Sequence, residues 1–136
     1  MLLLFFAAAL SVHARQTLSF NEGWEFKKGP FAKDVMKSSS QWNGQWESVT
    51  IPHTWNAQDM QTRYDNFYEG AGYYRKHIDC PAEWKDKRVF LRFEGVGACA
   101  EVYVNQQLVG THRGGYSAFI VEIGAALKSG GSNEII

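Results

Sequence analysis

The sequence predicts an all-β protein, a β-sandwich of jelly-roll type, from three observations. Apolar and polar residues alternate with a period of two over several short runs, as strands with one buried face require. Gly, Pro, Asn and Asp separate these runs at short intervals. No window of helical length has apolar residues spaced three and four apart. Many short strands with frequent turns favour a sandwich over a helical or mixed fold.

The expected strands are those in which apolar residues share one face. They lie around Trp24 and Phe26, over residues 73–78, around Val89, Leu91 and Phe93, around Val102 and Val104, and around Phe119, Val121 and Ile123. Residues 73–78 are rich in aromatic and branched side chains, and we expect Tyr73 and Tyr74 to pack in the core. Residues 81–87 predict one short helical turn, and residues 28–46 predict a surface loop.

The first residues differ from the rest of the chain. Residues 1–10 form an apolar run that is too short to cross a bilayer, which takes about 20 residues. Val12, His13 and Ala14 then have the small-x-small pattern of a cleavage site. We interpret residues 1–14 as a secretory signal peptide, although no Lys or Arg precedes the apolar run. This predicts a secreted or periplasmic protein; a buried first strand or helix is the alternative.

Residues 15–136 are then expected to form one domain that is truncated at its C-terminal strand. Residues 129–133 predict a turn, and residues 134–136 look like the beginning of a new strand. Three residues are about half of a usual strand. We therefore expect an incomplete sheet edge at this end.

The charge balance excludes some partners. Lys plus Arg and Asp plus Glu number 14 each, so no basic excess is present to bind phosphates, and neither nucleic acid nor a membrane surface is an expected partner. The two cysteines, Cys80 and Cys99, lack the paired spacing of a zinc site, and the sequence leaves open whether they form a disulfide. No cluster of metal ligands appears, and we expect no metal and no cofactor.

The sequence shows no convergent set of catalytic groups. Glu94, Glu101 and Glu122 lie on the polar faces of expected strands, where solvated carboxylates are usual. No Ser lies in a nucleophile-elbow pattern, and no helix is expected after the glycines at 95–97 and 114–115 to bind a phosphate. We expect no catalytic residue in this chain.

One stretch, residues 55–74, has a composition suited to binding a sugar. It combines amides, carboxylates, an Arg and several aromatic rings, and sugars are bound by stacking on rings and by hydrogen bonds to such polar groups. The candidate sugar contacts are Asp59, Asp65, Asn66 and Tyr68. Local contacts within the loop are an equally good interpretation of these residues.

Five motifs in order carry a family resemblance. They are FNEGWEF at 20–26, IPHTWN at 51–56, GYYRK at 72–76, LRFEGV at 91–96 followed by AEVYVN at 100–105, and VGTHRGGYSAF at 109–119. Together they resemble the sugar-binding amino-terminal domain of glycoside hydrolase family 2, the family of β-galactosidases and β-glucuronidases. Two departures are Asn105-Gln106-Gln107 where the family has Asn-Gly at a hairpin turn, and Glu122-Ile123-Gly124 where it often has Asp-Ile-Thr.

The resemblance implies a galactose-binding-domain-like jelly roll that does not itself cleave. In family members an immunoglobulin-like domain follows, and then a TIM barrel with two catalytic glutamates of a retaining mechanism. The implied function is the non-catalytic part of a secreted exo-glycosidase, a β-galactosidase with β-glucuronidase as the alternative, inactive as this fragment alone. The implied partners are a terminal β-linked sugar and the immunoglobulin-like and TIM-barrel domains of the same protein.

The resemblance also implies which residues touch the sugar. In galactosidases an Asn on the loop before the GYYRK-type strand contacts the terminal sugar, and the matching residue here is Asn66, with Asp59 and Asp65 as further candidates. Two interpretations from other classes stay open. One is a free-standing carbohydrate-binding module, and the other is a structural sandwich such as an adhesion domain.

Overall fold

The computed structural model describes residues 15–29, 45–56 and 68–136. The regular secondary structure of this part of the chain consists of strands and two short 3-10 turns, so the expected all-β class is confirmed, and the expected helical turn after residue 81 is confirmed as η2. The elements are β1 (Trp24–Gly29), β2 (Glu47–Val49), β3 (Ala71–Asp79), η2 (Ala82–Trp84), β4 (Phe90–Phe93), β5 (Cys99–Val104), β6 (Gln107–Arg113), β7 (Phe119–Glu122), η3 (Gly124–Ala126) and β8 (Ser132–Ile135).

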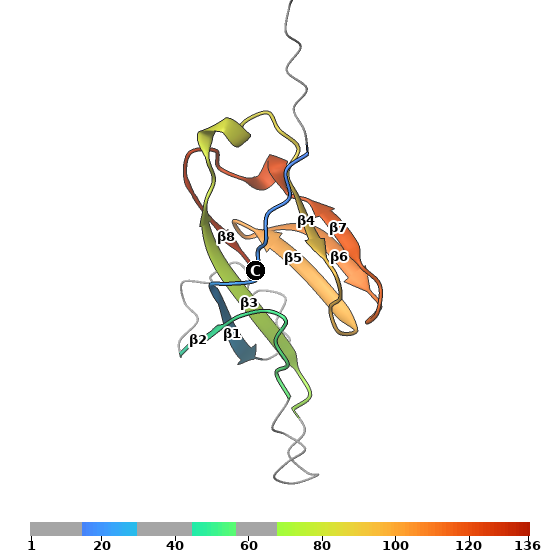
Figure 1. Ribbon diagram of the computed structural model, residues 1–136. Helices are drawn as coiled ribbons and strands as arrows, with labels where there is room; N and C mark the ends of the chain where they lie inside the picture. Colours follow the sequence, from blue (N-terminus) through green and yellow to red (C-terminus); the bar gives the residue numbers. More distant parts are fainter. Residues whose placement is uncertain (1–14, 30–44, 57–67) are drawn as a thin grey trace, which may run out of the picture.

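The strands form two antiparallel sheets (Figure 1). The larger sheet has the order β2-β1-β3-β8-β5-β6, and the smaller consists of β4 and β7. The smaller sheet lies close to the β5–β6 hairpin, because a Cβ atom on Gly110 of β6 would be 2.7 Å from the Val121 side chain of β7. A glycine at this position therefore lets the two layers approach closely.

The core lies between the two sheets and follows the predicted alternation. Its fully buried members are Trp24, Val102, Val104, Val121, Ile123 and Ile135. Burial of an aliphatic or aromatic side chain of this size contributes about 1.5–3 kcal/mol, so these residues account for much of the driving force for folding. All but Ile135 lie in strands or strand ends that the alternation predicted.

The expectation for Tyr73 is corrected. Tyr74 pairs with Phe26 and packs against the core, as predicted. Successive residues of a strand point to opposite faces, so Tyr73 lies on the outer face of the six-stranded sheet together with Arg75. Aromatic enrichment correctly indicated a strand, but only one of two adjacent rings can enter one core.

The last strand also differs from its expected form. β8 begins at Ser132, so the preceding turn is shorter than predicted. It lies inside the sheet, where Ile135 pairs with Lys76 of β3 and with Val104 of β5. The edges of the six-stranded sheet are β2 and β6, so β8 is not an edge strand, and its register with β5 comprises Val104 and Ile135. The expected truncation at this strand stays a prediction. The jelly-roll order of connections stays a prediction.

The β5–β6 hairpin keeps a two-residue turn despite the missing glycine. Val104 pairs with Gln107, and the two residues between them, Asn105 and Gln106, have φ values of 50° and 69°. Positive φ at both central positions is what a type I′ turn requires, and Asn adopts it more readily than most residues. The departure from the family pattern therefore leaves a strained Gln106 in a turn of the usual shape.

Asn105 has a second role through its side chain. Its Nδ2 donates to the Ala126 carbonyl at 2.8 Å and to Asn133 Oδ1 at 2.8 Å, and its Oδ1 accepts from the Glu134 amide at 3.1 Å. The turn is thereby joined to η3 and to β8.

These two turn residues should respond oppositely to glycine. Gln106→Gly relieves a left-handed side chain and should raise the free energy of unfolding by up to about 1 kcal/mol. Asn105→Gly removes three hydrogen bonds worth about 0.5–1.5 kcal/mol each. This substitution should therefore lower the free energy of unfolding, and by more than the gain expected for Gln106→Gly. Urea denaturation of both variants and the parent gives the comparison. Equal effects of the two substitutions would show that the Asn105 side chain stabilises nothing.

Candidate functional site

Three of the four candidate sugar contacts, Asp59, Asp65 and Asn66, lie outside the described residues. The structure does describe the residues on either side of that segment and the surface from which it leaves. We call this group the loop base. It consists of Phe26, His53, Trp55, Asn56, Tyr68 and Tyr74.

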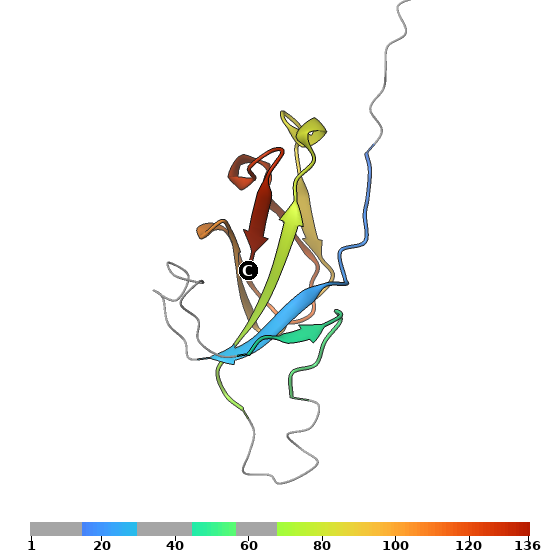
Figure 2. The same ribbon diagram turned by 90° about the vertical axis from the view of Figure 1, so that its left-hand side faces the viewer.

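The loop base forms where the segment after β2 packs against the paired end of β1 and start of β3. The pairing of these two strands can be followed in Figure 2. The Ile51 amide donates to the Asn21 carbonyl at 2.9 Å, which fixes the start of this segment. Phe26 then lies beside Tyr74 and His53, with ring centroids 4.9 Å and 4.8 Å away. The sandwich core therefore continues to this end of the molecule as an aromatic cluster.

His53 and Tyr74 form the polar part of this cluster. The His53 Nδ1 and the Tyr74 hydroxyl are 3.0 Å apart. Burial raises the pKa of the Tyr74 hydroxyl, because a phenolate would lose its solvation there. This pair therefore satisfies two half-buried polar groups and fixes the segment to β3.

Trp55 lies directly on the backbone of β3. A Cβ atom on Gly72 would come within 1.7 Å of its Cζ3 atom, so only glycine leaves room for the indole. Phe26 and Tyr68 meet the ring edge-on, with centroid distances of 6.0 Å and 6.2 Å. Despite these contacts Trp55 is 37% exposed.

Tyr68 closes the loop base from the other side. Its hydroxyl lies 2.8 Å from the Gly29 carbonyl and 3.1 Å from the Ala71 carbonyl, and donates to them. The ammonium group of Lys28 lies 5.0 Å from the centre of its ring. In these contacts the hydroxyl joins the end of β1 to the start of β3. A sugar contact by Tyr68 stays a prediction.

Asn56 holds the two sides of the loop base together. Its Nδ2 donates to the Tyr68 carbonyl at 3.3 Å. Its Oδ1 is buried without a hydrogen-bond partner, alone among the side-chain atoms of the described residues. An unsatisfied buried acceptor costs about 1–3 kcal/mol. The loop base thus contains a buried acceptor that the described residues leave unpaired.

The carboxylates of the expected strands lie on the surface in local pairs. Glu94 binds Arg92 at 2.9 Å, and Glu122 binds Arg88 at 2.9 Å. Arg88 lowers the pKa of Glu122. Glu101 accepts from the Tyr103 hydroxyl at 2.6 Å, and this hydrogen bond raises the pKa of Tyr103 to about 12. The prediction that these strand carboxylates are solvated is in keeping with their positions.

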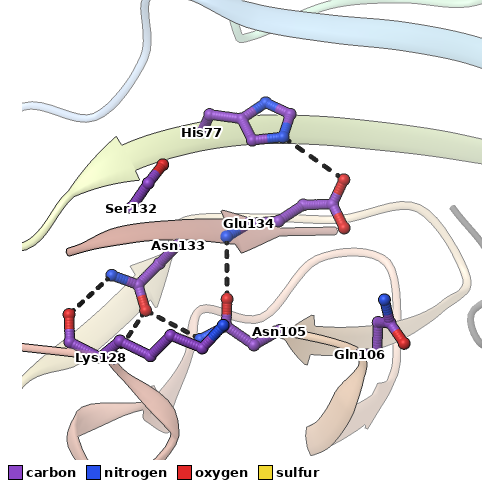
Figure 3. A pocket seen from close by; sticks show the side chains of 7 residues that line it. All are labelled: His77, Asn105, Gln106, Lys128, Ser132, Asn133 and Glu134. Carbon is purple, nitrogen blue, oxygen red and sulfur yellow. Dashed lines mark hydrogen bonds and ion pairs between the residues drawn. The ribbon is translucent and has the colours of Figure 1, made fainter. Parts of the chain in front are cut away.

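A shallow depression on the outer face of the large sheet is the second candidate (Figure 3). It is lined by His77, Asn105, Gln106, Lys128, Ser132, Asn133 and Glu134. Asn133 is buried, and both of its polar atoms are bonded, to Asn105 and to backbone groups of Lys128 and Gly131. His77 and Glu134 point toward each other at 3.5 Å (Figure 3). These contacts hold β8 in place, and we assign the depression a structural role.

Other kinds of site receive no support from the described residues. They contain no group of three or more metal-ligating side chains and no helix long and apolar enough to cross a membrane. Cys80 is buried and Cys99 is exposed, and both are free thiols.

Trp55 and Asn56 belong to the IPHTWN motif but were not among the candidate sugar contacts predicted from the sequence. Both belong to the stretch of suitable composition, but their environment depends on β3, which lies later in the chain. Gly72 is the signal in the sequence that could have indicated this packing. A glycine within a strand often marks a site where another group lies close to the backbone.

The contact between Trp55 and Gly72 yields a stability test. Gly72→Ala places a methyl group inside the indole and should lower the free energy of unfolding by about 1–3 kcal/mol, the usual cost of overpacking. Gly97→Ala is the matched control, because a Cβ atom there meets nothing within 4 Å. Thermal unfolding of both variants measures the difference. Similar melting temperatures for the two would contradict the described packing of Trp55.

Comparison with known proteins agrees with the fold. Residues 12–136 match the family described as Glycosyl hydrolases family 2, sugar binding domain. A β-glucuronidase of Bacteroides fragilis is 41% identical over 129 residues, which cover 94% of this chain and 17% of the relative. A β-galactosidase of Thermoanaerobacter pseudethanolicus is 32% identical over 126 residues, covering 90% of this chain and 16% of the relative.

Solved structures show the same relationship. A crystal structure of a candidate β-galactosidase from Bacteroides fragilis is 67% identical with a TM-score of 0.79, covering 90% of this chain and 18% of that one. The β-glucuronidase of Bacteroides uniformis is 36% identical with a TM-score of 0.76, covering 88% and 14%. The chain thus spans less than a fifth of the length of each of these relatives. The chain belongs to glycoside hydrolase family 2, as its amino-terminal sugar-binding domain.

Proposed function

We propose that this chain is the non-catalytic, sugar-binding part of a secreted retaining exo-glycosidase that removes terminal β-galactosyl residues. The observation that carries the proposal is the family match over residues 12–136, and the 67% identity to a candidate β-galactosidase supports galactose as the sugar. Hydrolysis with retention takes two closely spaced carboxyl groups. We assign these to a TIM-barrel domain of the whole protein, which is also where the bond is broken.

The loop base supports a role in placing residues 57–67 against the substrate. Asn56 and Tyr68 stand at the two ends of this segment, and the hydrogen bond between them joins those ends. Tyr68 is joined in turn to both β1 and β3. Fixing both ends of a loop lowers the entropy that is lost when the loop binds a ligand. Such a loop suits an Asn66 amide that must meet a sugar hydroxyl repeatedly in one geometry.

β-Glucuronidase is the second candidate. The observation that favours it is the 41% identity to a β-glucuronidase of Bacteroides fragilis. In that case the residues that recognise the sugar carboxylate belong to the barrel, and this domain has the same part in both activities.

The proposed function predicts which part of the protein is active. The full-length protein should hydrolyse a chromogenic β-galactoside, whereas the purified chain of residues 15–136 should give no turnover above buffer. A parallel assay with a chromogenic β-glucuronide separates the two substrate classes. Turnover by the chain alone would place catalytic groups in this domain and contradict the proposal.

The proposed function also predicts the effect of replacing Asn66. An amide can donate and accept at once, which matches a sugar hydroxyl. A neutral hydrogen bond contributes about 0.5–1.5 kcal/mol, and a contact that tightens in the transition state lowers kcat/KM when it is lost. Asn66→Ala in the full-length protein should therefore reduce kcat/KM about tenfold, since 1.4 kcal/mol is one decade.

The control for this variant is Gln107→Ala, which removes an exposed side-chain amide at the start of β6. Melting temperatures of both variants are measured with the kinetics. A loss of stability in Asn66→Ala with unchanged kcat/KM would show that Asn66 supports its own loop and does not touch the sugar.

A further inference from the structure

The exposed indole of Trp55 stands apart from the other exposed apolar side chains. Among the described residues it is the one tryptophan in that group, which otherwise contains Leu18, Phe90, Leu108, Tyr116 and Ile120. Single exposed apolar residues are common and need no explanation. The position of Trp55 is what distinguishes it, because it lies in the loop base, two residues before segment 57–67 begins.

The indole is also held in one orientation. One part of it lies against the backbone of Gly72, and the rings of Phe26 and Tyr68 meet it edge-on. A side chain confined in this way loses little entropy when a ligand covers it. The residue is nevertheless 37% exposed, so part of it remains accessible to a ligand.

One polar group of the indole is left for a ligand. The Nε1–H of Trp55 donates to no acceptor among the described residues. A ligand hydroxyl that covers the indole can accept from this group.

We propose that Trp55 is a stacking platform for a pyranose ring of the substrate. The C–H groups on one side of a pyranose form an apolar surface that packs against an aromatic face, while its hydroxyls bond to groups around the ring. Trp55 offers that face, and its Nε1–H is a donor without an acceptor among the described residues. The inference rests on the proposed function, because it assigns the sugar that the enzyme acts on to this end of the sandwich.

The test uses Trp55→Ala and Trp55→Phe in the full-length protein. Stacking that is equal in the ground state and the transition state affects KM and not kcat. Trp55→Ala should raise KM for the chromogenic β-galactoside at least about threefold with kcat nearly unchanged, in line with the usual strength of ring stacking. Trp55→Phe keeps a flat ring and should restore most of the binding.

Intrinsic fluorescence gives an independent readout. Titration of the parent with a non-hydrolysable thio-β-galactoside should change the tryptophan emission, and Trp55→Phe should remove most of that change. Trp84→Phe is the matched control, because Trp84 is also a partly exposed tryptophan but lies in η2, after the opposite end of β3. This variant should retain the fluorescence change and the KM of the parent.

The possible outcomes separate this inference from the proposed function. A parent that cleaves β-galactosides, with KM and fluorescence response unchanged in Trp55→Ala, would overturn the platform and leave the proposed function intact. A lower melting temperature of Trp55→Ala with parental KM would instead limit the indole to its packing on Gly72, Phe26 and Tyr68, and would also overturn the platform. A parent that cleaves neither β-galactoside nor β-glucuronide removes the proposed function and the platform together.

Discussion

The position of β8 between β3 and β5 is the constraint on which the six-stranded sheet depends. Without this strand, β2-β1-β3 and β5-β6 would be two separate antiparallel groups. Backbone hydrogen bonds join Ile136 to Tyr103 in both directions, at 2.7 Å and 3.0 Å, and the side chains of Asn105 and Asn133 complete the junction. Buried polar groups stabilise a fold only when each has a hydrogen-bond partner. Here both polar side-chain atoms of Asn133, Oδ1 and Nδ2, have partners. A buried polar cluster and the hydrophobic core thus specify the same arrangement of strands.

The continuous sheet in turn provides the support for the loop base. Because β1 pairs with the first half of β3, the end of β1 at Gly29 and the start of β3 at Ala71 lie side by side, and the Tyr68 hydroxyl reaches both. The segment after β2 is fixed against this pair by aromatic packing and by the hydrogen bond of Asn56 to Tyr68. Functional loops on rigid scaffolds are common because the scaffold provides the precision that a loop lacks. Trp55 is held in the same way, because it packs on Gly72 of β3 and on the rings of Phe26 and Tyr68.

The chain matches the sugar-binding domain of glycoside hydrolase family 2 and spans less than a fifth of the length of its relatives. The strand carboxylates Glu94, Glu101 and Glu122 are engaged in surface pairs, and the loop base combines aromatic rings with the amide of Asn56. Cleavage of a glycosidic bond needs convergent carboxyl groups, whereas recognition of a sugar needs flat rings and amides. The described residues therefore fit recognition, in agreement with the sugar-binding description of the family.

The sequence by itself determined the class of fold, most of the core and the family. Alternation with a period of two is a local property, so Val102, Val104, Val121 and Ile123 could be assigned to the core without knowledge of their neighbours. The motifs around Trp24 and Gly72 were equally local. Only the tertiary structure decided that β8 is an interior strand, that Tyr73 and Tyr74 take opposite faces, and that Trp55 lies on Gly72. Each of these depends on pairing between segments distant in the chain, and a local pattern shows that a strand exists without showing which strand will lie beside it.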